Sequence, residues 1–302
     1  MSNRAAPDSA VCRRAKRAPP PVRSFAVFFV SSTCRRIRKG FAALISAVHL
    51  GLIDYANALA LQRRLVDARK QGTTGDVLLF LEHSPVITLG RNARREHVLV
   101  SAQELQDQRV GIFECDRGGD VTFHGPGQLV GYPIFDLRGF ACAPTKRKSL
   151  GAVEFVRRLE EVLIRTCAAF KVLSQRVPGL TGVWTRETES KPPAKIAAIG
   201  VHVSQSVTSH GFALNVNTNL DYFRWIVPCG ISCKPVTSME NELGAKVDLQ
   251  GVMGAAARSF AEVFQTEIEL VESLEQLSHK LGLPLRPPAE LRRLYEEETY
   301  WA

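Results

Sequence analysis

The segment 117–133, Arg-Gly-Gly-Asp-Val-Thr-Phe-His-Gly-Pro-Gly-Gln-Leu-Val-Gly-Tyr-Pro, places four glycines within ten residues. Glycine loses more conformational entropy on folding than any other residue, so such a cluster indicates positive φ angles or a ligand close to the main chain. A tight hairpin followed by a strand would account for the glycines alone. It does not account for the hydrogen-bonding side chains that alternate with these glycines and flank them, namely Arg117, Thr122, His124 and Gln128. The segment therefore predicts a loop that both turns the chain and contacts a bound group.

The excess of positive charge lies at the amino-terminal end. The chain has 39 Lys and Arg against 30 Asp and Glu, a net charge of +9. Residues 1–40 hold ten of the basic and one of the acidic residues, which leaves 29 of each in residues 41–302. Nucleic-acid-binding domains concentrate basic residues on their folded surface. The balanced charge of 41–302 therefore gives no support to a nucleic-acid partner.

Residues 1–40 are rich in Arg, Ala, Pro and Ser and show no sustained periodicity, so we expect a disordered basic arm. An Arg- and Ser-rich, acid-poor start also resembles an organelle transit peptide. The run Pro19–Pro21 and the lack of a clean amphipathic pattern favour translated sequence upstream of the functional start instead. We expect one large domain over 41–272 and a peripheral C-terminal extension over 273–302.

Seven cysteines are scattered along the chain without a paired framework, which favours a reducing compartment. The longest apolar run of the arm, Phe25–Val30, has six residues and is too short for a membrane span. We therefore expect a protein without a membrane partner in the bacterial cytoplasm, with the mitochondrial matrix as the alternative.

Hydrophobic periodicity predicts helices over 54–69, with Asp54 as N-cap, and over 150–170 and 252–264. Strands are predicted over 77–81, 86–89, 111–115, 130–137, 195–203 and 209–216, the last two as a hairpin. Order is expected to begin near Ala47. Because helices and strands mix without strict alternation, the predicted class is α/β with a mixed, largely antiparallel sheet and packed helices.

Cys229 stands between Pro228 and Gly230 rather than in an apolar periodic run such as that around Cys167. A rigid turn of this kind can expose the sulfur as a nucleophile, although a buried loop cysteine fits the spacing as well. A zinc site shared with Cys233 would need two further ligands, and the candidates are His202 and His210, without a second Cys-x-x-Cys pair. We expect no metal.

Lys195 begins an otherwise apolar strand, where a charge ordinarily marks the end that meets solvent. The alternative is a lysine that faces a site and lowers the pKa of a nearby thiol. Small residues recur on the two strands of the predicted hairpin, which fits either close packing or a groove for an acyl chain. These residues are Ala198, Gly200, Gly211 and Ala213.

Four ordered segments, 117–128, 195–200, 209–216 and 226–230, together resemble the lipoyl(octanoyl) transferase family. The similarity extends over about residues 47–270. It implies the fold shared by the lipoate and biotin protein ligases and an octanoyltransferase catalytic domain over 41–272. It also implies transfer of an octanoyl group, without a cofactor, from octanoyl-acyl carrier protein to a lysine of a lipoyl domain. The lipoyl domains would belong to 2-oxoacid dehydrogenase complexes and to the glycine cleavage H protein.

By position in this resemblance, Cys229 corresponds to the acyl-thioester nucleophile and Lys195 to the residue that lowers the pKa of its thiol. Lys195 and His124 are both candidates to accept the proton of the incoming lysine. The substrate-contacting segments correspond to Arg117, Gly118, Gly119, Asp120, Val121, Thr122, Phe123, His124, Ala198, Ile199, Gly200, Gly211, Phe212 and Ala213.

Three other functions stay open from the sequence. An ATP-dependent lipoate or biotin ligase of the same fold would activate a free acid as an adenylate and would need no nucleophilic cysteine. A non-catalytic module that binds lipoyl domains or carrier proteins would leave Cys229 inert. A thioesterase would release free octanoate without a lipoyl domain.

Deletion of residues 1–40 tests the expected organisation. Because the arm carries no apolar periodicity with which to join a core, we expect the truncated chain to keep its activity and its melting temperature. Thermal unfolding and the acyl-transfer rate of both chains measure this. A large loss of either quantity would show that the arm belongs to the folded unit.

Overall fold

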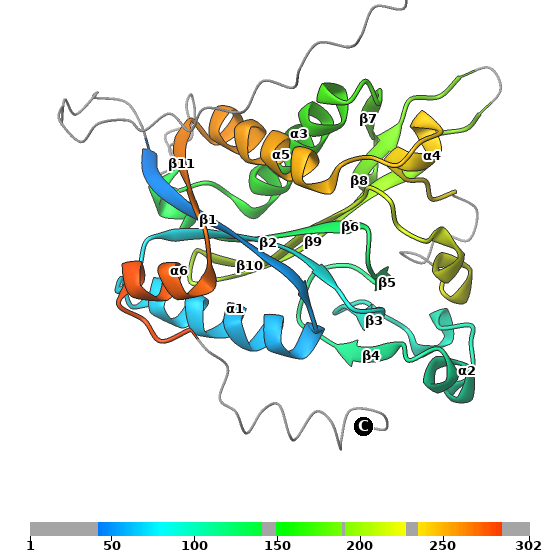
Figure 1. Cartoon of the computed structure of the whole chain (residues 1–302), viewed down its shortest axis with the longest axis horizontal. Helices are drawn as coiled ribbons and strands as arrows, with labels where there is room; N and C mark the ends of the chain where they lie inside the picture. Colours follow the sequence, from blue (N-terminus) through cyan, green and yellow to red (C-terminus); the bar gives the residue numbers. More distant parts are fainter. Residues whose placement is uncertain (1–41, 141–148, 189–190, 228–234, 286–302) are drawn as a thin grey trace, which may run out of the picture. The chain divides into compact units, whose positions relative to one another are not determined.

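The computed structural model describes residues 42–140, 149–188, 191–227 and 235–285, and its main element is an eight-stranded sheet (Figure 1). The strand order is β11-β1-β2-β6-β10-β9-β8-β7. Strands β11, β1 and β2 run parallel to one another, and all other neighbours are antiparallel. The predicted fold class, a mixed and largely antiparallel sheet with packed helices, is confirmed. The strands are β1 Ala42–Ile53, β2 Asp76–His83, β6 Gln128–Ile134, β7 Ser174–Val177, β8 Leu180–Thr185, β9 Lys195–Ser204, β10 Val207–Asn215 and β11 Thr266–Val271.

A three-stranded sheet in the order β4-β3-β5 lies beside the main sheet. It consists of β3 Val86–Leu89, β4 Gly111–Glu114 and β5 Val121–His124. The predicted strands 77–81 and 86–89 are both present, but they belong to different sheets. Strand β5 is not predicted from the sequence, because it lies inside the glycine-rich segment and contains only four residues.

Two pairs of helices cover the two faces of the main sheet (Figure 1). Helices α3 (Ala152–Ala169) and α5 (Leu249–Phe264) pack on one face, and α1 (Tyr55–Lys70) and α6 (Leu274–Leu281) pack on the other. Strand β2 shows the alternation, since Leu78 and Phe80 face α3 and α5 whereas Leu79 faces α1. The shorter helices are α2 (Ala102–Asp107) and α4 (Met239–Leu243), with 3₁₀ turns at Arg95–His97, Leu137–Gly139 and Leu220–Trp225.

The three long predicted helices are confirmed, and Asp54 caps α1 by accepting a hydrogen bond from Asn57 N at 2.8 Å. The expected start of order near Ala47 is wrong, because β1 begins at Ala42. This strand lies between two parallel neighbours under helices on both faces. Its sequence is therefore apolar without a period of two, and the alternation that identifies a half-buried strand is missing.

The C-terminal segment enters the core as far as the structure describes it. Leu277 of α6 is fully buried, and Leu285 joins the same hydrophobic cluster as Leu61 and Leu65 of α1. Both Leu277 and Leu285 fall in the range 273–302 that the sequence analysis assigns to a peripheral extension. Residues 286–302 and the basic arm lie outside the described residues.

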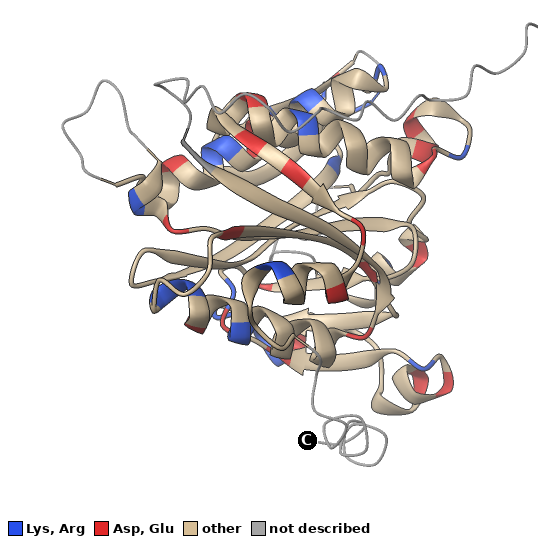
Figure 2. Ribbon diagram, turned by 60° about the vertical axis from the view of Figure 1, so that its left-hand side comes forward, with Lys and Arg blue, Asp and Glu red and all other residues tan. Residues whose placement is uncertain are grey.

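Charged side chains of both signs are interspersed over the helices and strands in Figure 2. This distribution agrees with the electrical balance of residues 41–302. Within the ranges that the structure describes, no helix is long and apolar enough to cross a membrane.

Truncation of Leu277 measures the contribution of α6 to the fold. Because this side chain is fully buried, Leu277→Ala should lower the free energy of unfolding by about 2–5 kcal/mol. Urea denaturation gives the value. Leu173→Ala is the matched control, since Leu173 is 60 % exposed and its truncation should change stability by no more than about 0.5 kcal/mol. Equal effects of the two substitutions would contradict the packing described here.

Candidate active site

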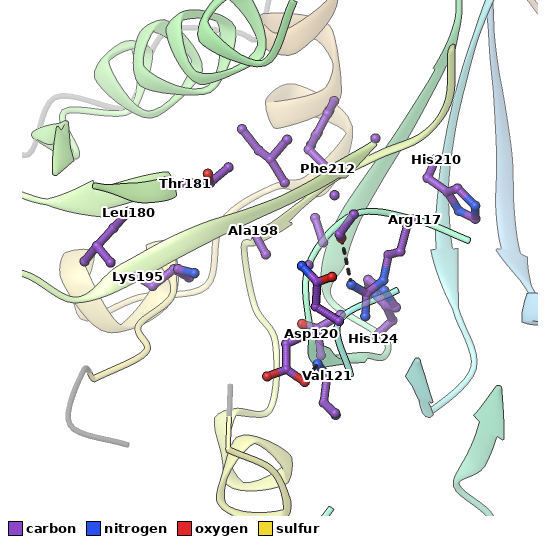
Figure 3. A pocket seen from close by; sticks show the side chains of 18 of the residues that line it. Arg117, Asp120, Val121, His124, Leu180, Thr181, Lys195, Ala198, His210 and Phe212 are labelled. Carbon is purple, nitrogen blue, oxygen red and sulfur yellow. Dashed lines mark hydrogen bonds between the residues drawn. The ribbon is translucent and has the colours of Figure 1, made fainter. Parts of the chain in front are cut away.

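A cavity of about 310 Å³ lies between the main sheet and the glycine-rich loop (Figure 3). Four small residues line it from β9 and β10, where Ala198 pairs with Ala213 and Gly200 pairs with Gly211. Residues two apart on a strand share a face, so these positions together leave space above the sheet. The repeated small residues of the hairpin thus border an open cavity.

The glycine-rich loop closes on the sheet at one point. Gly118 N donates a hydrogen bond to Val201 O at 3.0 Å, and a Cβ added to Gly200 would lie 2.6 Å from Gly118 O. Gly119 has a φ of 93°. A larger residue at Gly200 would push the loop off the strand, and one at Gly119 would strain the turn. Glycine is therefore required here for two reasons, the close approach of the loop to β9 and the positive φ of Gly119.

Arg117 holds this loop against β3. The side chain is buried, and its Nε and terminal nitrogens donate to Thr88 Oγ1 at 3.1 and 2.9 Å and to Thr88 O at 2.6 Å. On the same loop, Asp120 Oδ2 lies 2.6 Å from His97 Nδ1, and Asp120 Oδ1 accepts from Val121 N at 2.7 Å. The polar residues between the glycines thus fix the loop conformation as well as lining the cavity.

A chain of buried hydrogen bonds leads from Arg117 through His124 to Asn215 of β10 and Thr237. His124 Nδ1 lies 2.7 Å from Gln128 Oε1, and Gln128 Nε2 donates to Asn215 Oδ1 at 2.8 Å. Asn215 Nδ2 in turn donates to Thr237 O at 2.9 Å. Since Gln128 Oε1 can only accept, His124 carries its proton on Nδ1.

The other ring nitrogen of His124 faces Thr88 Oγ1 at 3.5 Å, so its lone pair can accept the hydroxyl proton of Thr88. Burial, with His83 as the next cause, lowers the pKa of His124 to about 3. His124 is therefore neutral near pH 7, and both its nitrogens are turned toward protein groups. This arrangement argues against His124 as the acceptor of a substrate proton.

Lys195 lines the cavity from the start of β9 and is 8 % exposed. Its Nζ lies 4.9 Å from the centre of the Trp184 ring. The main chain of Lys195 is bonded to the residues that follow position 234. Lys195 N donates to Pro235 O at 2.8 Å, and Thr237 N donates to Lys195 O at 3.0 Å. Of the two interpretations drawn from the sequence, the structure supports a lysine that faces a site.

Cys229 lies in the range 228–234, outside the described residues, and so does Cys233. The two histidines considered beside them as zinc ligands are described. His210 Nε2 lies 2.7 Å and His202 Nε2 lies 3.6 Å from the carboxylate oxygens of Asp116. His210 also has a positive φ of 55° within β10, although it keeps its pairing with Val201 of β9. Figure 3 shows His210 and Lys195 at opposite ends of the cavity.

The structure brings most of the predicted substrate-contacting residues together around this cavity. Those that line it are Arg117, Gly118, Gly119, Asp120, Val121, Thr122, His124, Ala198, Ile199, Gly200, Gly211, Phe212 and Ala213. Phe123 is not among them. Its ring is buried on the other side of β5 and stacks on Tyr222, with 4.5 Å between the ring centres.

Several lining residues are not predicted from the sequence as substrate contacts, among them Tyr55, Asn92, Tyr132, Leu180, Thr181 and His210. Tyr55 opens α1 directly after its N-cap, and Tyr132 lies within an apolar strand, so neither stands out as a site residue in the sequence. Leu180 and Thr181 follow Gly179, whose φ is 79°. The Pro178-Gly179 pair is the one local signal that marked this turn.

Two buried histidines should make the protein sensitive to acid. Burial lowers the pKa of His83 to about 4, below the unfolded value of 6.5, so the unfolded chain binds more protons between these values. The free energy of unfolding should fall as the pH drops through this window, by about 1.4 kcal/mol per pH unit for each such group. His83→Gln removes one of these groups, so it should reduce the slope by about 1.4 kcal/mol per pH unit.

Urea denaturation at a series of pH values measures the slope. His279→Gln is the control, because His279 is exposed on α6 and should leave the slope unchanged. An identical slope in the parent chain and in His83→Gln would contradict the assignment of His83 as a buried neutral group.

Comparisons with known proteins show the family and the fold. The octanoyltransferase of Koribacter versatilis is 54 % identical over 258 residues, which cover 85 % of this chain and 99 % of that protein. The octanoyltransferase of Acidobacterium capsulatum is 55 % identical over 241 residues, which cover 79 % and 98 %.

Among solved structures, lipoate-protein ligase A bound with ATP has a TM-score of 0.62 at 14 % identity and covers 86 % of this chain and 97 % of that one. A bi-partite lipoate protein ligase from Thermoplasma acidophilum has a TM-score of 0.59 at 14 % identity, with coverage of 86 % and 95 %. At these identities the likeness shows a shared fold. Residues 54–261 match the family described as the lipoyl protein ligase A/B catalytic domain. The chain is therefore an acyltransferase that belongs to this family, and the relatives that it matches over nearly their full length are octanoyltransferases.

Proposed function

We propose that this chain transfers an octanoyl group from octanoyl-acyl carrier protein to a lysine of a lipoyl domain, through a thioester on Cys229. The observation that carries the proposal is the ammonium of Lys195 in the wall of a cavity bordered by small residues. A cation in such a wall would favour the thiolate form of a cysteine beside it and so lower the pKa of the thiol. The small residues leave room for a straight acyl chain.

Both flanks of the segment that contains Cys229 are bonded beside this cavity. Val227 N donates to His97 O at 2.8 Å, and His97 contacts Asp120 of the cavity wall. At the other flank, Pro235 O accepts from the main chain of Lys195. Cys229 is two residues from Val227 and six from Pro235. These attachments support a thiol that works together with Lys195.

In the first step the Cys229 thiolate forms a bond to the carbonyl carbon of the donor thioester. The bond from that carbon to the sulfur of the carrier then breaks, and the leaving thiolate takes a proton from the Lys195 ammonium. The exchange replaces one thioester by another of nearly equal energy, so no ATP is required.

In the second step the lysine of the lipoyl domain attacks the acyl-enzyme as a neutral amine. The carbon–nitrogen bond forms, the bond to Cys229 sulfur breaks, and the amine proton passes to the neutral Lys195, which regains its charge. His124 is not used, because its ring nitrogens are turned toward Gln128 and Thr88. One lysine therefore serves both proton transfers.

The cavity also suits the acyl chain. Each buried methylene contributes about 0.8 kcal/mol, so a chain that fills the space beside Ala198 and Ala213 binds more tightly than a shorter one. The contact of Gly118 with β9 narrows the space at Gly200. One methylene changes selectivity by only about 10–200-fold, so neighbouring chain lengths should still react slowly.

The rival functions make different demands. A ligase needs ATP and free lipoate or biotin, a binding module leaves Cys229 unmodified, and a thioesterase releases octanoate without an acceptor. The curated relatives that match over nearly their full length are octanoyltransferases, which favours the transferase. For partners we infer the lipoyl domains of 2-oxoacid dehydrogenase complexes and the glycine cleavage H protein, and for location the cytoplasm.

Intact-mass measurement after incubation with octanoyl-acyl carrier protein tests the proposal. We expect an octanoyl adduct on the parent chain that is absent in Cys229→Ala and is discharged by a lipoyl domain. Cys115→Ala is the control, because Cys115 is half-buried and donates to Leu89 O at 3.4 Å. Absence of the adduct on the parent chain supports the binding module, release of octanoate without an acceptor supports the thioesterase, and loading of free lipoate with ATP supports the ligase.

The pH profile of iodoacetamide labelling at Cys229 tests the role of Lys195. Lys195→Ala removes the ammonium that stabilises the thiolate, so the midpoint of labelling should move to higher pH. Lys191→Ala is the control, since Lys191 is exposed and does not line the cavity. An unchanged profile in Lys195→Ala would refute the proposed ion pair.

A further inference from the structure

Trp184 and Lys195 are cross-strand partners on β8 and β9. The register of these two strands shifts between Val183 and Trp184, so that Trp184 comes to lie opposite Lys195. The distance from Lys195 Nζ to the centre of the ring is 4.9 Å, within the range of a cation–π interaction. The irregular register therefore brings an aromatic side chain to the lysine that lines the cavity.

Both partners are held on rigid backbone. Trp184 pairs with Gln175 of β7 on its other side, so it lies on an inner strand of the sheet. Lys195 is bonded through its main chain to Pro235 and Thr237. The hairpin that carries Trp184 is fixed to α3, since Gly182 N donates to the buried carboxylate of Glu160 at 3.2 Å. The contact between ring and ammonium thus follows from the fold of the main chain.

The indole of Trp184 can act on Lys195 through its apolar surface and through the face of its ring. Trp184 is 1 % exposed, and its Nε1 has no hydrogen-bond partner among the described residues. It does not line the cavity, whereas Lys195 does. The indole therefore stands behind the lysine, on the side away from the space that a substrate would occupy.

A lysine side chain has four rotatable bonds and loses considerable conformational freedom when its ammonium is confined to one position. The face of an aromatic ring attracts a cation most strongly when both groups are removed from water. Lys195, at 8 % exposed, and Trp184 meet this condition. A ring at this place can therefore confine the ammonium through the attraction of its face.

We propose that Trp184 is a positioning residue for the reaction, whose ring face holds the Lys195 ammonium at the cavity wall. This inference rests on the proposed function, in which that ammonium acts on the Cys229 thiol. Trp184 touches neither the acyl group nor the thiol in this account, and it acts only through Lys195.

Graded fluorination of the ring tests the inference, because fluorine withdraws electron density from the face and changes the ring volume little. The three tryptophans are Trp184, Trp225 and Trp301. In a chain with Trp225→Phe and Trp301→Phe, Trp184 is replaced by tryptophan analogues with successive fluorine substitutions. The readout is the pH midpoint and rate of iodoacetamide labelling at Cys229. We expect the midpoint to rise and the rate at pH 7 to fall in order of fluorination.

Substitutions give the second readout. Trp184→Phe keeps a ring face and loses an N–H without a described partner, so labelling should stay near the parent rate. Trp184→Leu removes the face, and the rate at pH 7 should fall about 2- to 30-fold, the range expected for a cation–π contact. Phe155→Leu is the matched control, since it truncates a buried aromatic side chain of α3 and should lower the melting temperature without moving the pH midpoint.

The outcomes separate this inference from the function on which it rests. If Lys195→Ala leaves the labelling profile unchanged, the proposed ion pair fails and this inference fails with it. If Lys195→Ala shifts the profile while neither fluorination nor Trp184→Leu does, the ion pair stands and the role of Trp184 is overturned. A shift in Trp184→Leu with no rescue in Trp184→Phe would assign the effect to packing and would also overturn it.

Discussion

The hydrogen bond from Gly118 N to Val201 O joins the glycine-rich loop to the main sheet, and the cavity exists in its present form because of it. It forms only because Gly200 has no side chain, since a Cβ there would lie 2.6 Å from Gly118 O. Once the loop is seated, Arg117 is directed to Thr88 and His124 to Gln128. The absence of a side chain at Gly200 of β9 thereby allows the loop position in which Arg117 and His124 make these hydrogen bonds.

These buried polar groups are costly unless each finds a partner. The chain from Arg117 through Thr88, His124 and Gln128 to Asn215 satisfies them in a single direction, each group donating to the next. Such a chain specifies one protonation state for the histidine, neutral with its proton on Nδ1. It ends at Thr237 O, and Thr237 N donates to Lys195 O. The network thus connects the buried guanidinium of Arg117, through the neutral His124, to the main chain that is bonded to Lys195.

A second buried cation, Lys195, lines the cavity from the start of β9. Lys195 is buried between the ring of Trp184 and the cavity, and its main chain is bonded to the residues that follow the segment 228–234. Its surroundings alone distinguish Lys195 from a lysine at the solvent-exposed end of a strand. The cavity thus combines a cation at Lys195 with small residues at Ala198 and Ala213, and the proposed transfer uses the first for the thiolate and the second for the acyl chain.

Much of this protein can be read from its sequence. The helices over 55–70, 152–169 and 249–264 follow from apolar periodicity and, for the first, from Asp54 as a cap, because these signals are local. The glycine-rich segment and the small residues of β9 and β10 mark a site because their cost in entropy and packing needs a reason at those positions. The strand β1 and the buried Leu277 could not be read in this way, since their burial depends on partners far away in the chain.

Composition and spacing identify the residues that carry reactive groups and the positions where the backbone needs glycine. The fold sets the environment of these groups: Lys195 faces a cavity instead of solvent, Phe123 turns away from it, and His124 is neutral. The physical reason is that periodicity and composition report short-range preferences. The environment of a charged or polar group depends instead on the strands, rings and carbonyls that the fold brings to it from distant segments, as β8 brings Trp184 to Lys195.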